Sequence, residues 1–230
     1  MIGIIGGSGL YSGLAELGGE EKIVRTRFGD KKVLVGENFV FLSRHGNPPV
    51  PPHMVKYHAN MDVFHILKIK KVIAISSVGS LIKELEPGTV MVPDDLLDFT
   101  GRVWTYHNEK PVHVNLYEPF CPSLRDEISQ ISDMKIGGTY ATTKGPQFET
   151  RAEAKMLRML GASVVGMTVA PEARLARELE LCYQPICPIV NYVDEKTTHQ
   201  NTIDMVKAME SQIAEIIKEL IERNSVGSAH

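Results

Sequence analysis

The sequence predicts a single α/β domain in which helices flank a mixed central β-sheet. Two observations predict this fold. Short runs rich in valine and isoleucine, which favour strands, recur along the chain, and segments whose apolar residues have helical spacing lie between several of them. A length of 230 residues is enough for one substantial core, so we expect one domain rather than two.

The individual elements follow from these patterns in chain order. The valine- and isoleucine-rich runs predict strands at Ile2–Ile5, Lys32–Val35, Phe39–Leu42, Val72–Ser76, Val90–Val92, Val164–Met167 and Ile186–Val190. Apolar residues three and four positions apart predict helices at His58–Ile69, Ala152–Leu160, Pro171–Leu181 and Thr202–Glu222. The apolar side of the last helix predicts that it packs on the sheet. We expect the domain to occupy residues 1–224 and residues 225–230 to form a flexible tail.

Composition and charge argue against several classes of protein. The net charge is −3 with acids and bases interspersed, which leaves no basic face for a nucleic acid. No apolar run approaches the roughly 18 to 20 residues that span a bilayer, and the N-terminus lacks the basic start and the cleavage site of a secretion signal. We therefore expect a soluble cytoplasmic protein without a membrane or nucleic-acid partner. Three cysteines, an odd number without CxxC spacing, predict buried free thiols rather than disulfides or a zinc site.

Polar residues follow three of the predicted strands and indicate an anion site. The glycine-rich segment Gly6–Gly9 follows the first strand, Arg44 and His45 follow a second, and Ser76 and Ser77 end a third. Backbone N–H groups, an arginine fork, an imidazole and hydroxyls together can hold phosphate. The third glycine of a dinucleotide fingerprint and the lysine of a Walker A loop are missing, so a small phosphate fits better than NAD or ATP. Taken singly, each residue has an alternative structural role as a turn, salt bridge, structural histidine or cap.

Two further segments lie at predicted strand ends. Thr168, just before a predicted helix, can add a hydroxyl to the anion site. The neighbouring Met167 can lie under a sugar, although a methionine more often only fills the core. The four prolines of Gly46–His53 exclude regular structure and predict a stiff loop beside the anion site.

Another group of residues is suited to a planar base. Phe148 can stack on a ring, and Glu149 can accept hydrogen bonds from ring N–H groups. Thr150 and Glu153 have the spacing of a capping box, which would leave Phe148 and Glu149 free of the cap. Asn191 ends an apolar strand, where a turn cap is the alternative role.

Read together in chain order, these stretches resemble the family of trimeric purine nucleoside phosphorylases and methylthioadenosine phosphorylases. The resemblance covers nearly the whole chain, and it implies the nucleoside phosphorylase fold. Its motifs are GIIGGSGL at Gly3–Leu10, SRHG at Ser43–Gly46, PPHMVKYHAN at Pro51–Asn60, SSVGSL at Ser76–Leu81, EPFCP at Glu118–Pro122, GPQFETRAE at Gly145–Glu153, GMTVAPE at Gly166–Glu172 and NYVDE at Asn191–Glu195.

The resemblance implies roles for individual residues. Those around phosphate are Ser8, Arg44, His45, Ser76, Ser77 and Thr168. Those that bind the nucleoside are Tyr57 and Met167 at the ribose, Phe148, Glu149 and Asn191 at the base, and His199 at the ribose 5′-hydroxyl, with Val193 as a further substrate-binding residue. Among these, His45, Glu149 and Asn191 are expected to act in catalysis. His113 matches a residue that reaches the sugar of a neighbouring subunit, which implies a homotrimer or a dimer of trimers.

The resemblance also implies the reaction, which is that of a pentosyltransferase in purine salvage. Inorganic phosphate would be a co-substrate, with no cofactor and no metal. Asn191 can donate to a 6-oxo group and accept from a protonated N7, whereas an aspartate at this place suits adenine. Glu149 can accept the N1–H that only a 6-oxopurine carries. We therefore expect a purine nucleoside phosphorylase that cleaves inosine and guanosine.

Alternatives to this reaction stay open at the level of the sequence. The first third of the chain looks more like the methylthio-nucleoside branch, which makes a methylthioinosine or methylthioadenosine phosphorylase the main alternative. The chain is shorter at its C-terminus, where that branch places apolar residues against the methylthio group. A sensor that binds without turnover and a nucleoside hydrolase are two further classes, and phosphate dependence separates both from a phosphorylase.

Overall fold

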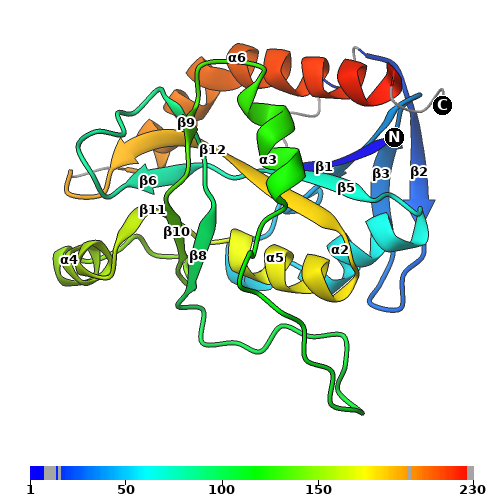
Figure 1. Ribbon diagram of the computed structural model, residues 1–230, viewed down its shortest axis with the longest axis horizontal. Coiled ribbons are helices and arrows are strands. Elements are labelled where there is room, and N and C mark those ends of the chain that lie inside the picture. The colour runs from blue at the N-terminus through cyan, green and yellow to red at the C-terminus, as the bar shows by residue number, and fades with distance from the viewer. Residues whose placement is uncertain (8–13, 15–16, 196–197, 227–230) are drawn as a thin grey trace.

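The computed structural model describes residues 1–7, 14, 17–195 and 198–226. Across these residues the strands form one hydrogen-bonded sheet with helices on both faces (Figure 1), which confirms the predicted α/β class. The strands are β1 (Ile2–Gly6), β2 (Glu20–Val24), β3 (Lys31–Val35), β4 (Phe39–Ser43), β5 (Lys71–Ile75), β6 (Val78–Ser80), β7 (Val90–Val92), β8 (Asp95–Asp98), β9 (Lys135–Ile136), β10 (Thr139–Thr142), β11 (Ala162–Gly166) and β12 (Cys182–Tyr192). The helices are η1 (Pro52–Met54), α2 (Tyr57–Ile66), α3 (Pro122–Ser129), α4 (Arg151–Met159), α5 (Val169–Glu178) and α6 (His199–Val226).

The strand order determines where polar residues gather. The order is β2-β3-β4-β1-β5-β12-β6-β11-β10-β8, with β7 paired to β12 and β9 paired to β7. Strands β4, β1, β5 and β12 run parallel to one another, whereas β2, β3 and β4 pair in antiparallel fashion. Because parallel neighbours end at the same edge, the residues that follow β1, β4 and β5 emerge side by side.

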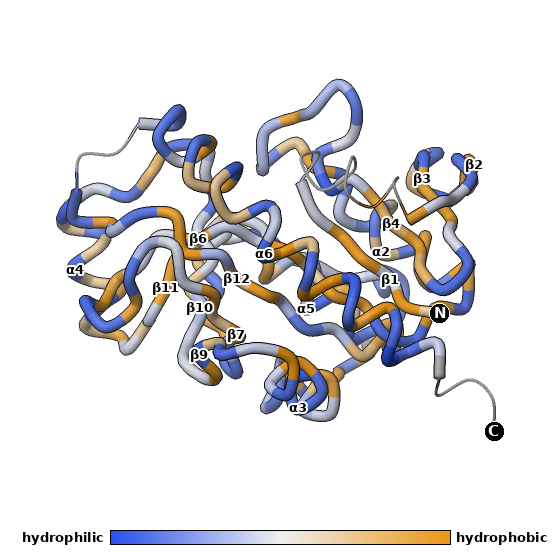
Figure 2. The backbone as a smooth tube through the Cα atoms, turned by 90° about the horizontal axis from the view of Figure 1, so that it is seen from above, coloured by the Kyte–Doolittle hydropathy of each residue, from blue (hydrophilic) through white to orange (hydrophobic). Residues whose placement is uncertain are grey.

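Alternation along the strands fills a core on each face of the sheet. Ile4 packs in a cluster with α3 and α6, whereas its neighbour Ile5 packs in a cluster with α2 and α5. In Figure 1, α6 lies above the sheet and α2 and α5 lie below it. Figure 2, viewed from the α6 side, shows hydrophobic and hydrophilic residues alternating along α6, whose buried residues include Met209, Ile213 and Ile217. No helix in the described ranges is both long and apolar enough to cross a bilayer.

Several elements differ from those predicted. Strands β2 and β8 were missed because they carry charged residues, which is common in strands at the edge of a sheet. Strands β6, β9 and β10 and helix α3 were missed because each has eight residues or fewer and lacks a clear apolar period. Helix α6 extends beyond both of its predicted ends. The turn η1 forms inside the loop where no regular structure was predicted, with Pro52 at its first position, where the missing N–H is not needed.

The cysteines also differ from the prediction of three free thiols. Cys121 and Cys182 form a disulfide across 61 residues of sequence, and only Cys187 is a buried free thiol. The backbone explains the pairing, because the Cys121 N–H donates to the carbonyl of Tyr183 at 2.9 Å and so holds the start of α3 against β12. The prediction was wrong because it rested on local spacing and an odd count, neither of which reports long-range proximity.

Candidate functional site

A cavity of about 890 Å³ lies at the carboxyl ends of β1, β4 and β5. The sheet holds its floor in place: the Arg44 N–H donates to the Gly6 carbonyl at 2.8 Å, and the Ser76 N–H donates to the Ile186 carbonyl at 3.0 Å. The loop before η1, strands β11 and β12, and helix α6 supply the other walls. The predicted site residues that line the cavity are Arg44, His45, Ser76, Ser77, Phe148, Glu149, Met167, Thr168, Asn191, Val193 and His199.

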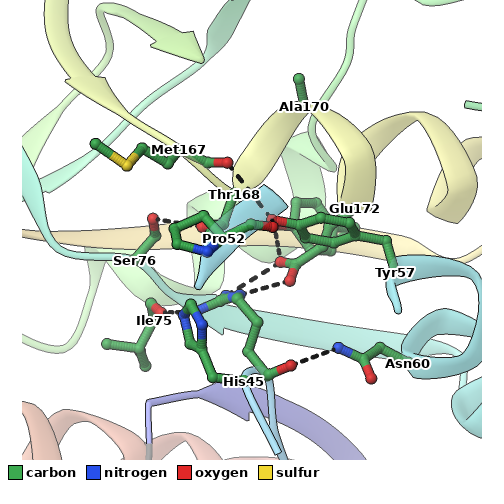
Figure 3. Close-up of polar contacts among 12 residues, drawn as sticks. His45, Pro52, Tyr57, Asn60, Ile75, Ser76, Met167, Thr168, Ala170 and Glu172 are labelled. Atoms are coloured by element: carbon green, nitrogen blue, oxygen red, sulfur yellow. Dashed lines mark hydrogen bonds and ion pairs between the residues drawn. The ribbon is translucent and has the colours of Figure 1, made fainter. Parts of the chain in front are cut away.

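Arg44 is the cation of the site and is buried against the sheet. Its Nε and Nη2 atoms donate to the two carboxylate oxygens of Glu172, at 2.5 Å and 3.1 Å, and its Nη1 atom donates to the Ile75 carbonyl at 2.7 Å (Figure 3). Burial lowers the pKa of Arg44, but the charge and hydrogen bonds of Glu172 outweigh it and raise the pKa above its ordinary value. The guanidinium is therefore protonated, with N–H groups still available on the cavity side.

His45 lies next to this cation with a defined tautomer. Its Nδ1 atom is 2.8 Å from the carbonyl oxygen of Val50. A carbonyl can only accept, so Nδ1 carries the proton and Nε2 of the neutral ring is left as an acceptor. Desolvation, followed by repulsion from Arg44, lowers the pKa of His45, which keeps the imidazole neutral near pH 7.

Hydroxyl groups complete this end of the cavity. Ser76 Oγ lies 3.0 Å from the hydroxyl of Tyr140 and 3.2 Å from Oγ1 of Thr168. Thr168 occupies the N-cap position of α5, its side chain makes no capping bond, and it lines the cavity near the helix N-terminus. Ser77 lines the same wall and is exposed. A cation, an imidazole and hydroxyls thus converge as donors and acceptors for a small oxyanion.

The other end of the cavity combines an aromatic ring, a carboxylate and an amide. Phe148 is 48 % exposed, and Glu149 beside it accepts a hydrogen bond from Thr143 Oγ1 at 2.7 Å. The predicted capping box of Thr150 is confirmed and leaves Glu149 out of the cap. Asn191 is half-buried, and its Nδ2 atom donates to the Tyr192 carbonyl at 2.9 Å. Its Oδ1 atom and second N–H remain for a planar polar ring.

Helix α6 forms a wall of the cavity that sequence reasoning missed. Val206, Met209 and Ile213 line the cavity, together with His199 and Thr202 from the first turns of the helix. The apolar stripe of α6 was predicted only to pack on the sheet. Met209 and Ile213 do so, and together with Val206 they also line the cavity. The signal was therefore present and was assigned a single role.

Three predicted residues are placed elsewhere or lie outside the described residues. Tyr57 is buried and is not among the residues that line the cavity; its hydroxyl donates to the Pro52 carbonyl at 3.0 Å and lies 3.5 Å from the Met167 carbonyl. His113 is exposed in the long segment between β8 and α3, away from the cavity lining. Ser8 falls outside the described residues.

Comparisons with known proteins agree on one family. The sequence model of the phosphorylase superfamily matches residues 1–222. A probable S-methyl-5′-thioinosine phosphorylase of Methanothermobacter thermautotrophicus is 44 % identical over 215 residues, which cover 90 % of this chain and 76 % of that protein. The 6-oxopurine nucleoside phosphorylase of Pyrococcus furiosus is 38 % identical over 240 residues, covering 94 % and 90 %. A mutant adenosine/methylthioadenosine phosphorylase from Schistosoma mansoni, solved with methylthioadenosine, superposes with a TM-score of 0.89 at 27 % identity, covering 100 % and 92 %.

Proposed function

We propose that 6-oxopurine nucleosides and inorganic phosphate are the substrates of this chain, which belongs to the phosphorylase superfamily and is a nucleoside phosphorylase, a pentosyltransferase. The observation that carries the proposal is that one cavity is lined both by the oxyanion donors around Arg44 and by the pair Glu149 and Asn191. Such a cavity accommodates a nucleoside and phosphate together. Inosine and guanosine are the nucleosides that fit best.

The anion end of the cavity would orient phosphate beneath the sugar. Arg44, Ser76, Ser77 and Thr168 would donate hydrogen bonds to phosphate oxygens, and His45 Nε2 would accept one from a protonated oxygen. A phosphate oxygen then attacks C1′ while the C1′–N9 bond breaks and its electron pair moves to the purine. The proton that HPO₄²⁻ loses on forming ribose 1-phosphate balances the proton that the free base gains. Catalysis comes from positioning and electrostatics, without a side-chain nucleophile.

The base end accounts for the choice of a 6-oxopurine. Asn191 would stabilise the purine as it leaves, donating to the 6-oxo oxygen and accepting from the protonated N7. Glu149, held by Thr143, would accept the N1–H, and Phe148 would stack on the ring. Adenine has a 6-amino group and no N1–H, so it would leave Glu149 and Asn191 unpaired in the closed site, which can reduce turnover by a factor of about 10⁴.

The group at the sugar 5′ position gives a second candidate function. The exposed imidazole of His199 in the cavity wall suits a 5′-hydroxyl. Val206 and Ile213 in the same wall suit an apolar 5′-methylthio group, which favours methylthioinosine as the alternative substrate. Met167 would lie under the ribose, and Tyr57, whose hydroxyl is directed at Pro52 and Met167, would support this contact from behind.

We also propose that the chain works as a homotrimer in the cytoplasm, in purine salvage. The segment between β8 and α3 extends away from the body of the molecule (Figure 1). It carries His113 between Val112 and Val114, and it exposes 85 % of Val103 and 89 % of Tyr117. Such apolar exposure suits a second copy of this chain, and His113 would then complete the 5′ end of the neighbouring cavity.

A panel of four nucleosides tests the proposed function. Release of free base is measured from inosine, methylthioinosine, adenosine and methylthioadenosine, each with and without phosphate. Phosphate-dependent release of hypoxanthine is the expected result, and the better of the two 6-oxopurine substrates identifies the 5′ group. Faster release of adenine contradicts the roles of Asn191 and Glu149. Release of base at the same rate with and without phosphate identifies a hydrolase, and no release of base identifies a binding protein.

A further inference from the structure

Glu172 is a buried carboxylate that lies behind the site and does not line the cavity. It projects from a face of α5 that is otherwise apolar and includes Val169, Ala173 and Ala176. Its two oxygens accept from Nε and Nη2 of Arg44, and one of them also accepts from the Tyr183 hydroxyl at 2.8 Å. The side chain of Glu172 is fully buried, and the side chains of Arg44 and Tyr183 are only 3 % and 2 % exposed.

The Arg44 guanidinium has more N–H groups than Glu172 and Ile75 accept. A guanidinium has five N–H groups. Glu172 takes two from Arg44, and the Ile75 carbonyl takes a third. The remaining two, one on each terminal nitrogen, have no acceptor among the described residues, and Arg44 lines the cavity. These two N–H groups form a fork of the kind that binds phosphate oxygens in pairs.

The charges point to orientation rather than to attraction as the role of Glu172. The carboxylate neutralises the guanidinium, so the pair adds no net charge to draw an anion in. A buried ion pair is also often no more stabilising than an apolar pair of the same size. Burial, followed by the charge of Glu172, raises the pKa of Tyr183, so its hydroxyl stays protonated and can donate. The hydrogen bonds between Glu172 and Arg44 therefore fix the plane of the Arg44 guanidinium.

We propose that Glu172 and Tyr183 are positioning residues of the phosphate site, which hold Arg44 so that its two remaining N–H groups face the bound phosphate. This inference rests on the proposed function. Tyr183 is itself held in place, because its carbonyl accepts from the Cys121 N–H and its neighbour Cys182 is in the disulfide. Neither Glu172 nor Tyr183 lines the cavity, so both act through Arg44.

Substitutions at Glu172 separate orientation from charge. Glu172→Gln removes the negative charge, so a role in charge compensation alone predicts unchanged or tighter phosphate binding. Glu172→Asp keeps the charge but has a shorter side chain. A role in charge compensation alone therefore predicts unchanged phosphate binding for this variant. Positioning predicts that both variants raise the phosphate KM and the Kd for inorganic phosphate, by about tenfold or more. The nucleoside KM should stay within about twofold of the wild type, since positioning affects only the anion end.

Tyr183→Phe keeps the experiment decisive if the Glu172 variants do not fold. It deletes one hydroxyl and should raise the phosphate KM about three- to tenfold, with the nucleoside KM unchanged. Tyr106→Phe is the matched control, because Tyr106 is also buried and donates one hydrogen bond, to the His58 carbonyl, away from the cavity. Its phosphate KM should equal that of the wild type.

The outcomes keep this inference and the proposed function apart. If wild-type protein releases no base in a phosphate-dependent way, the proposed function fails, and calorimetry with inorganic phosphate still tests the positioning role. If the wild type is active but Tyr183→Phe and the folded Glu172 variants bind phosphate as the wild type does, the inference is overturned. An equal effect in Tyr106→Phe overturns it as well.

Discussion

Gly79 of β6 is paired in register with Asn191 of β12, and a Cβ atom on Gly79 would lie 3.4 Å from Nδ2 of Asn191. The same Cβ would lie 2.8 Å from Cγ2 of Val193, a distance that real Cβ contacts do not show. The absence of a side chain at Gly79 therefore leaves the space that Val193 occupies at the cavity, next to Asn191. The lack of a side chain at Gly79 thus helps to determine where Val193 lies in the cavity wall.

Gly79→Ala should damage nucleoside binding while sparing phosphate binding. The added methyl group would overlap Cγ2 of Val193 and displace that side chain, and a displacement near 1 Å at the cavity can cost about a hundredfold in kcat/KM for inosine. The phosphate KM, determined at saturating inosine, should change by less than about twofold. Steady-state kinetics in both substrates check this. A larger effect on phosphate than on inosine would remove Val193 from the nucleoside site.

Asn191→Asp should shift preference from 6-oxopurines toward adenine nucleosides. An ionised carboxylate accepts from a 6-amino group but repels a 6-oxo oxygen, and it also loses the donor to the Tyr192 carbonyl. We expect kcat/KM for inosine to fall by about 10² or more and the adenosine-to-inosine ratio to rise. The rates of base release from both nucleosides give the ratio. An equal loss on both would mean that Asn191 does not read the base.

Arg44→Lys should weaken phosphate selectively without unfolding the protein. Lysine keeps the positive charge, so Glu172 is not left as an unpaired buried charge, a loss that costs about 3–5 kcal/mol. An ammonium lacks the rigid fork that holds Glu172 and phosphate together. The phosphate KM should rise about tenfold or more. The control Arg102→Lys changes an exposed arginine that donates to the His53 carbonyl, and it should leave the phosphate KM unchanged.

The disulfide should contribute stability that reductant removes. Closing a loop of 61 residues restricts the unfolded chain and is worth about 4 kcal/mol in the chain-entropy model. The double variant Cys121→Ser and Cys182→Ser should therefore have a lower Tm than the wild type, measured by thermal unfolding. Cys187→Ala is the control that keeps the disulfide.

Thiol titration checks the disulfide independently of stability. The unfolded wild type has three cysteines, of which two are paired, so it should show one reactive thiol without reductant and three with it. Three thiols without reductant would contradict the pairing. In the folded protein Cys187 is buried, so it should react only slowly.

The sequence predicted the central strands of the sheet, and the polar residues that meet where these strands end, because both depend on local patterns. The apolar runs of β1, β4 and β5 identify strands, and the polar residues that follow them meet because those strands are parallel neighbours. Arg44, His45 and Ser76 were placed in one site by this reasoning, and the structure brings them to one cavity. Polar residues at strand ends can therefore be recognised as site candidates from the local sequence alone.

Other features of the site could not be predicted, because they depend on contacts between segments that are distant in the sequence. Glu172 reads in the sequence as an ordinary acidic residue of a first helical turn, and only the fold places it against Arg44, 128 residues away. The approach of Gly79 to Asn191 depends on the pairing of β6 with β12, and β6 itself was too short to predict. The apolar stripe of α6 is visible in the sequence, but only the fold shows that Val206 at one end of it lines the cavity.

The measurement that tests the proposed reaction most directly is phosphorus NMR of the protein with inosine and inorganic phosphate. The expected result is loss of the phosphate signal and growth of a ribose 1-phosphate signal, equal in amount to the hypoxanthine released. Arg44→Lys should slow both changes together at limiting phosphate. Release of hypoxanthine with free ribose and unchanged phosphate would contradict phosphorolysis, and so would hypoxanthine release that does not depend on phosphate.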